Sequence, residues 1–298
     1  MASDLELFDF ALIDQRSDNA LQLEIPTMPF ATPAKTVERN TNDDLIVDSE
    51  IAIDKGEAKK DIDAILWSMR LCSIRRYFHQ RFWENETAEA EYASRVEASP
   101  RLESVADHSW HVADTVLLLA SHFPSLDLGW CLTLAILHDK MEIITGDKNP
   151  VGKDGTGRST HAFSTLKRKQ KETSELQAIK IYLSALRSGA RKQQGEALHE
   201  LLKGTSAEAR FVKAVDKLQA LSFVLLKKNG HFTDKHLLFT LRYSQKVKES
   251  FPALKTHYEE LRSRLILQVA RRRNTSVKRI EDICRNDQLS LLFPLDSQ

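Results

Sequence analysis

Glycine and proline are scarce in this 298-residue sequence, with 10 and 8 copies, about half their usual share. This scarcity argues against a turn-rich β-sandwich, a glycine-fingerprinted dinucleotide-binding fold and a low-complexity chain. No apolar run approaches the roughly 18 residues that a membrane span needs, and the first residues lack the pattern of a signal peptide. We therefore expect a helix-rich protein of the cytoplasm that does not enter a membrane.

Cysteine is also rare, and excess charge of either sign is absent. Cys72, Cys131 and Cys284 are widely separated and form no CxxC or Cys/His motif, which favours reduced thiols in a cytosol. The net charge of +1 gives no reason to expect wrapping of nucleic acid or binding to a membrane surface. With 42% hydrophobic residues, the chain can build a sizeable buried core.

The charge is distributed unevenly along the chain. Residues 1–63 hold fifteen Asp and Glu against six Lys and Arg, a net charge of −9 that leaves +10 for the rest. We predict an acidic, partly ordered extension over residues 1–57, a helical domain over 58–250, and a C-terminal helical segment with a tail over 251–298.

Apolar residues recur at helical spacing in several stretches, and no alternating strand pattern longer than four residues stands out. Two of these stretches open with the spacing of a capping box, at Ser104 with Asp107 and at Thr205 with Glu208. The class expected is all-α. Helices are predicted at 61–78, 104–123, 126–144, 205–225, 234–249 and 252–273, with a loop after Gly146 and a short helix after Ser276.

Histidines and acids interrupt the apolar faces of these predicted helices. They are His108, the adjacent pair His138 and Asp139, and Asp216. A buried charge costs several kcal/mol unless it is neutralised, paired or bound to a metal. One divalent ion could satisfy all four side chains together, and such a set with open positions is typical of a catalytic centre.

A metal ion in such a centre activates water and stabilises charge on a phosphoryl oxygen. Glu142 follows Asp139 by three residues, which puts it on the same side of a continuous helix, where it could orient or deprotonate water. Asp147 follows Gly146, where this helix should end. His111, one turn after His108, is expected to have a structural role.

Three stretches, Glu103–Ser109, His138–Asp147 and Glu208–Leu218, resemble the motifs of HD-domain metal-dependent phosphohydrolases, in the branch of the 5′-deoxynucleotidases. The resemblance covers roughly residues 60–230. It implies an all-α HD-domain bundle, flanked here by N- and C-terminal extensions. It also implies metal ligation by the four side chains above, and carboxylates at Glu142 and Asp147 that act on water and substrate.

Nucleotidase relatives carry an Arg followed by a Trp before the first motif, and Arg76 is the nearest equivalent as a substrate-binding residue. The expected Gly-Trp is absent here, Trp83 comes several residues late, and residues 79–100 form a longer insertion. We expect one divalent ion, with Mn, Co, Mg, Fe, Ni and Zn all open. His161 and His199 lie where dinuclear relatives carry two more histidines, so a second ion stays open.

The segment Gln288–Phe293 resembles peptides by which bacterial proteins dock on the replication sliding clamp. Packing of this tail on its own domain is the simpler alternative. A homodimer is also expected, because relatives often dimerise. The basic run at 167–171 is interpreted as a solvated face, with a phosphate-guiding patch as the alternative.

The resulting prediction is a phosphohydrolase of the nucleotidase kind that uses metal-activated water to remove phosphate from a nucleotide, a (deoxy)nucleoside 5′-monophosphate above others. The partner is therefore a nucleotide substrate. Two alternatives remain. The first is a phosphodiesterase or nuclease acting on DNA or cyclic nucleotides. The second is a non-catalytic HD-fold binding module tethered by its tail.

Overall fold

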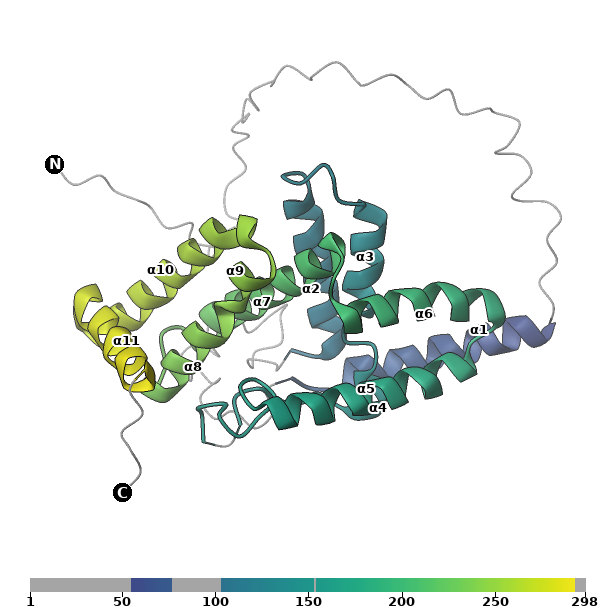
Figure 1. Ribbon diagram of the computed structural model, residues 1–298, viewed down its shortest axis with the longest axis horizontal. Helices are drawn as coiled ribbons and strands as arrows, with labels where there is room; N and C mark the ends of the chain where they lie inside the picture. Colours follow the sequence, from purple (N-terminus) through teal and green to yellow (C-terminus); the bar gives the residue numbers. More distant parts are fainter. Residues whose placement is uncertain (1–54, 77–102, 153, 293–298) are drawn as a thin grey trace, which may run out of the picture. The chain divides into compact units, whose positions relative to one another are not determined.

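The computed structural model describes residues 55–76, 103–152 and 154–292, all within a compact unit that runs from Ile53 to Gln298. Side chains are described up to Arg285. Across these ranges the chain forms α-helices and short 3₁₀ helices and no β-strand, so the predicted all-α class is confirmed (Figure 1). None of the helices in these ranges combines the length and apolar character that a membrane crossing requires.

The elements follow one another along the chain in a simple order. They are α1 (Lys55–Ser68), η1 (Met69–Ser73), α2 (Val105–Ala120), α3 (Leu128–Leu137), α4 (Glu142–Thr145), α5 (Thr165–Ala185), α6 (Ser188–Lys203), α7 (Ala207–Lys228), α8 (Asp234–Ser244), α9 (Lys246–Ser250), η2 (Pro252–Leu254), α10 (Lys255–Arg272) and α11 (Val277–Leu292).

The core is built around α2, α3 and α7, which pack on one another. The capping box predicted at the start of α2 is present, because Ser104 and Asp107 each bond the other's backbone amide. On α7, Phe211, Val215 and Leu218 repeat at helical spacing and are buried. These helices carry the motif residues, so the core also fixes the relative positions of the candidate ligands.

The predicted helix over 126–144 is wrong as a single helix. α3 ends at Leu137, and a separate short helix, α4, begins at Glu142. Between them the backbone bonds span three residues rather than four, from the Lys140 amide to Leu137 and from the Glu142 amide to Asp139, both at 3.0 Å. Glu142 therefore reaches the site from its own turn and not from the face of a continuous helix.

Other helix boundaries also differ from the sequence prediction. Ser206, rather than Thr205, caps α7, because its hydroxyl accepts the Ala209 amide at 3.0 Å. α1 begins at Lys55, six residues earlier than predicted, but ends at Ser68, where the 3₁₀ helix η1 follows to Ser73. α11 continues to Leu292 and is longer than the short helix predicted.

Two of the sequence predictions cannot be compared fully with the structure, because part or all of their residues are not described. The extension over residues 1–57 lies outside the described residues except for the first turn of α1. The clamp-docking segment Gln288–Phe293 belongs to α11 as far as Leu292, but its side chains are not described. Clamp docking, the homodimer and the predicted domain boundaries stay predictions.

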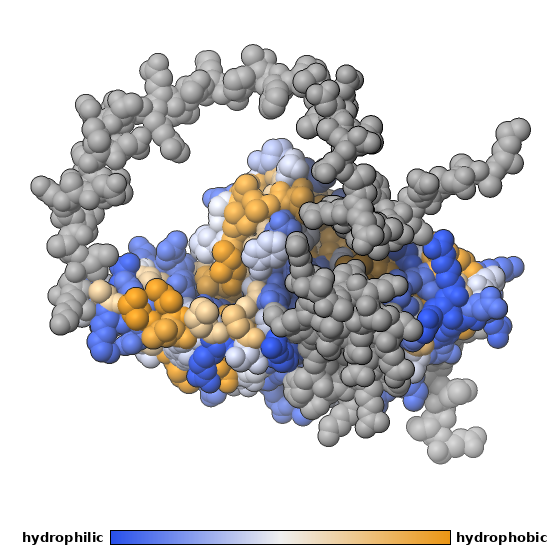
Figure 2. All heavy atoms as spheres, turned by 180° about the vertical axis from the view of Figure 1, so that it is seen from behind, coloured by the Kyte–Doolittle hydropathy of each residue, from blue (hydrophilic) through white to orange (hydrophobic). Residues whose placement is uncertain are grey.

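Part of the surface is hydrophobic, as Figure 2 shows for the face seen from behind. α1 packs on the core through Trp67, whereas Ile62, Ile65 and Leu66 are each more than half exposed. Within the described part of the chain, the outer face of α1 is therefore apolar and uncovered.

Lys228, at the end of α7, should make the free energy of unfolding change with pH in the alkaline range. It is 2% exposed, and burial lowers its pKa to about 8 from 10.5. Because the folded state binds this proton more weakly than the unfolded chain, the free energy of unfolding should rise between about pH 8 and pH 10.5, by up to about 3 kcal/mol. Urea denaturation at several pH values measures this rise. A Lys228→Met variant should lack it, and parallel curves for the two proteins would contradict the prediction.

Candidate active site

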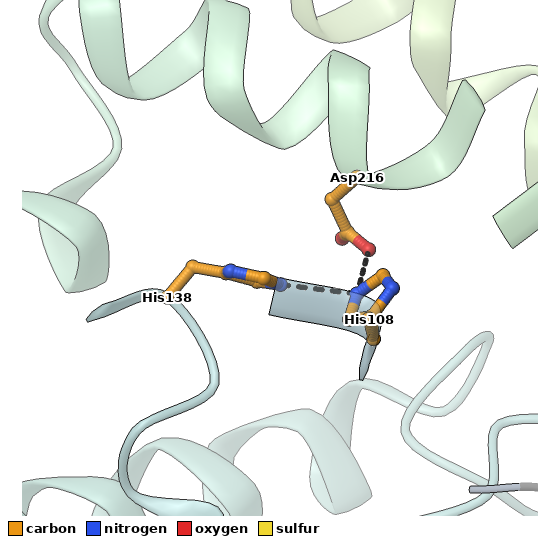
Figure 3. Close-up of side chains that lie close together, drawn as sticks. All are labelled: His108, His138 and Asp216. Carbon is orange, nitrogen blue, oxygen red and sulfur yellow. Dashed lines mark hydrogen bonds and ion pairs between the residues drawn. The ribbon is translucent and has the colours of Figure 1, made fainter. Parts of the chain in front are cut away.

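Side chains from three separate elements converge at the centre of the bundle. His108 comes from the first turns of α2, His138 from the end of α3, and Asp216 from the middle of α7, as Figure 3 shows. The two imidazole Nε2 atoms are 3.1 Å apart, and His108 Nε2 lies 3.1 Å from Asp216 Oδ1. Asp139 Oδ2 lies 3.3 Å from His138 Nε2 and 3.6 Å from His108 Nε2. The structure thus brings all four predicted ligands together.

Hydrogen bonds on the far side of each imidazole define which nitrogen faces the centre. His138 Nδ1 is 2.7 Å from the Ala135 carbonyl, which can only accept, so Nδ1 carries the hydrogen. His108 Nδ1 is 2.6 Å from Gln219 Oε1, and the Gln219 amide nitrogen donates to Glu103 at 2.6 Å. Both Nε2 atoms therefore turn a lone pair towards the same point, an arrangement that requires a proton or a cation between them.

The charges around this point are those of a cation site. Burial lowers the pKa of His108 to about 4, so this ring is neutral. Burial also disfavours the charged form of His138, but the neighbouring Asp139 outweighs it and raises the pKa of His138. A positive charge is thus already attracted to the position between the two rings.

The two aspartates remain anionic although they are largely enclosed by the protein, with side chains 22% exposed for Asp139 and 15% exposed for Asp216. Burial would raise the pKa of Asp216, but the adjacent Lys217 ammonium and His108 hold it well below its usual range. The pKa of Asp139 is likewise lowered against the effect of burial, chiefly by His138.

The donor set fits a divalent ion. Two nitrogens bound to one ion at about 2.1 Å lie roughly 3.0–3.4 Å apart, which matches the spacing of the two Nε2 atoms. Imidazole and carboxylate donors suit first-row divalent metals, and the four side chains leave positions for water or substrate. These donors do not distinguish among the metals.

The centre borders a cavity with about 900 Å³ of empty space, including solvent at its mouth. Asp139 and Asp216 lie in its wall, together with the three other residues assigned to chemistry from the sequence, Arg76, Glu142 and Asp147. Gly146 has a φ of 67°, a left-handed conformation that glycine adopts without strain, and the chain turns there immediately before Asp147.

Glu142 is the carboxyl group best suited to hold a proton in this cavity. Its Oε2 atom is buried and has no hydrogen-bond partner in the described part of the chain. Burial raises its pKa well above the usual value, and the negative charges of Asp139 and Asp147 raise it further. A carboxyl group whose pKa is raised in this way holds a proton more firmly than an exposed one, as a general acid requires.

Arg76 lies in the cavity wall but is also tied to the protein. Its guanidinium donates to Glu103 at 3.0 Å, and both side chains are buried. Burial raises the pKa of Glu103, while Arg76 opposes this shift. Trp83 and the 79–100 insertion lie outside the described residues.

Sequence reasoning assigned Lys217 no role at the site and Lys171 only the alternative of a phosphate-guiding patch, yet both line the cavity. In the basic run at 167–171, Lys167 and Lys169 are exposed as predicted, whereas Lys171 is partly buried and lines the cavity. A signal existed in the sequence: Lys171 precedes the buried Ala178 by seven residues, which is two helical turns. Nearby Glu175, at 3.3 Å, helps to raise the pKa of Lys171 against burial, so its charge persists.

The other histidines considered from the sequence, His161, His199 and His111, do not join the cluster of candidate ligands. His161 lines the cavity, but burial and the surrounding lysines lower its pKa to about 3. His199 bonds the Gly195 carbonyl within α6, and His111 is exposed on α2. Among the described residues, only His108, His138 and Asp216 form a cluster of at least three metal-ligand side chains.

Comparison with known proteins agrees with this geometry. The family model described as "HD domain" matches residues 93–255, more than half of the chain. The chain is 30% identical over 121 residues to human 5′-deoxynucleotidase HDDC2, with 41% of this chain and 52% of that protein covered. It is 26% identical over 143 residues to Schizosaccharomyces pombe 5′-deoxynucleotidase hdd1, with 43% and 65% covered.

Among solved structures, a predicted metal-dependent phosphohydrolase from Magnetospirillum magnetotacticum superimposes with a TM-score of 0.52 at 18% identity. The match covers 74% of this chain and 97% of that one, and it supports the fold alone. The chain spans about half the length of the mammalian relatives it matches. From the family match over more than half of its length, the chain belongs to the HD-domain family.

Proposed function

We propose that this protein is a metal-dependent phosphohydrolase that removes phosphate from a nucleotide, most specifically from a (deoxy)nucleoside 5′-monophosphate. The observation that carries the proposal is the convergence of His108, His138 and Asp216, with Asp139 beside them, at the wall of a large cavity. Relatives named as 5′-deoxynucleotidases support the choice of substrate.

The ligands of the ion would be His108, His138, Asp139 and Asp216. When bound there, a divalent ion would lower the pKa of a water molecule and reduce the charge on a phosphoryl oxygen. The protein's own contribution is to hold both Nε2 lone pairs and two anionic carboxylates at one point, out of bulk water. This prearrangement avoids reorganisation during the reaction.

Glu142 is proposed to hold the proton that the attacking water loses. Its buried Oε2 atom lies in the cavity wall next to Asp139, with no competing hydrogen bond among the described residues. Asp147 is proposed to orient water or the sugar of the substrate from the same wall. A proton held at Glu142 can pass to the leaving oxygen, which departs as an alcohol.

The phosphate would be held by cationic side chains in the same cavity. Against burial, Glu175 and then Asp139 raise the pKa of Lys171. The ion-pair partner of Lys217, Asp216, raises the pKa of Lys217 against burial. Both remain ammonium ions despite burial and can donate to phosphate oxygens. Further along α7 the wall becomes apolar at Leu221 and Val224, which suits a nucleoside beyond the phosphate.

Phosphate release from a panel of nucleotides with Mn²⁺, Co²⁺ or Mg²⁺ tests the proposal. We expect release from 5′-monophosphates and its loss with a chelator. Cleavage of oligonucleotides or cyclic nucleotides with monophosphates untouched would favour a phosphodiesterase or nuclease instead. No release from any of these substrates would favour a non-catalytic binding module.

Replacing Lys171 by methionine should weaken substrate binding more than turnover. A hydrogen bond from a charged group contributes about 1.5–3 kcal/mol, so kcat/KM should fall by roughly ten- to a hundredfold, mainly through KM. Lys169→Met, on the exposed face of the same helix, is the matched control and should leave the kinetics unchanged. Equal kinetics for both variants would mean that Lys171 does not contact the phosphate.

A further inference from the structure

A chain of four buried polar side chains leads from the cavity wall to one of the candidate ligands. Arg76 donates to Glu103 Oε2 at 3.0 Å, Gln219 donates to Glu103 Oε1 at 2.6 Å, and Gln219 Oε1 lies 2.6 Å from His108 Nδ1. Each of the four residues is at most 9% exposed. They come from the segment after η1, the residue before the N-cap of α2, the middle of α7, and α2 itself.

The direction of every hydrogen bond in this chain follows from its first member. A guanidinium can only donate, so it is complementary to a carboxylate at Glu103, and a carboxylate can only accept. Gln219 must then turn its NH₂ group towards Glu103 and its oxygen towards His108. With an acceptor beside it, His108 Nδ1 carries the hydrogen, and Nε2 presents its lone pair to the metal centre.

We propose that Arg76, Glu103 and Gln219 are positioning residues that fix the tautomer and orientation of His108 for metal binding. The inference rests on the metal centre of the proposed function, but not on the identity of the substrate. It gives Arg76 a second role beside the substrate contact predicted from the sequence. It also gives roles to Glu103 and Gln219, which have no other assignment at the site.

Two possible effects of Arg76 predict opposite changes in metal affinity when its side chain is removed. Arg76 is a cation, so its removal should tighten the binding of a second cation if simple Coulomb repulsion dominates. If Arg76 instead defines the polarity of the chain, its removal should weaken metal binding, because Glu103 and Gln219 can then reverse and His108 can change tautomer.

The experiment uses the whole 298-residue chain, stripped of metal and titrated with Co²⁺ by calorimetry. Gln219→Leu and Arg76→Met should each bind Co²⁺ about ten- to a hundredfold more weakly than the wild type. NMR of ¹⁵N-labelled histidine, recorded without metal, should show the Nδ1–H tautomer of His108 in the wild type and its loss in Gln219→Leu. A purely structural role would lower stability without changing the tautomer.

Gln194→Leu is the matched control, because Gln194 accepts a hydrogen bond from the core residue Tyr182 at 2.6 Å. This variant should be destabilised but should bind Co²⁺ as the wild type does. Unchanged Co²⁺ affinity in Gln219→Leu, or tighter binding in Arg76→Met, would overturn the inference while leaving the proposed function standing. A wild-type chain that binds no Co²⁺ would contradict the proposed function, and the NMR tautomer would still decide the role of Gln219.

Discussion

Replacing His138 by alanine should abolish metal-dependent phosphate release. His138 is expected to supply one of two nitrogen donors, and its Nε2 lies 3.1 Å from that of His108. Loss of an outer partner of a metal ligand alone costs about ten- to a hundredfold in affinity, so loss of the ligand should cost at least about a hundredfold. Turnover should fall by about a thousandfold or more, because the ion contributes several kcal/mol to the reaction. Calorimetry with Co²⁺ and a phosphate-release assay measure the two effects.

His111→Ala is the control for this substitution. His111 lies one turn after His108 on α2, but it is exposed and takes no part in the cluster. This variant should keep both metal affinity and turnover. If His138→Ala still bound Co²⁺ as tightly as the wild type, the ion would have to sit elsewhere. An added excess of metal that restored turnover in His138→Ala would show that only affinity, and not the chemistry, depends on this ring.

The fold was predictable where local rules determine it. The capping box at Ser104 and the apolar repeat of α7 are short-range features, and both are present. The interruption between α3 and α4 was not predictable in this way, because 126–144 is apolar enough to continue as a helix. The observed break instead places His138 at the end of α3, where its side chain bonds the Ala135 carbonyl and faces α2 and α7.

The candidate ligands could be named from the sequence because each occupies a fixed place in a motif. Their supporting residues could not. Glu103 and Gln219 are 116 positions apart and meet only because α2 packs on α7. Lys171 belongs to a basic run whose other members are exposed to solvent. In the sequence, only its spacing from the buried Ala178 separates Lys171 from those exposed residues. Tertiary packing, rather than local pattern, thus decides which polar residues complete the site.

Replacing Glu142 by glutamine should slow turnover strongly while leaving the metal in place. Glutamine keeps the shape of the side chain but cannot accept and return a proton. General acid–base catalysis contributes about a hundred- to ten-thousandfold, so kcat should fall by that factor. Co²⁺ affinity should change little, because Glu142 is outside the candidate ligand set. Glu200→Gln is the control, since Glu200 accepts from Trp130 at 3.0 Å outside the cavity, and its turnover should be normal.

Glu142→Gln is informative because it should lower turnover without changing metal affinity, so its effect reports on proton transfer alone. Burial, Asp139 and Asp147 all favour the protonated form of Glu142, and a cation bound between Asp139 and Asp216 would oppose them. Glu142 can therefore change its protonation state during a catalytic cycle, whereas Asp139 and Asp216 stay ionised. If Glu142→Gln kept full turnover, the proton would have to pass through another group, and Asp147 in the same wall is the candidate. A different outcome would be that purified wild type releases no phosphate while the Glu142→Gln variant replaces the wild type fully in cells. The metal centre would then serve to hold the helices of a binding module together.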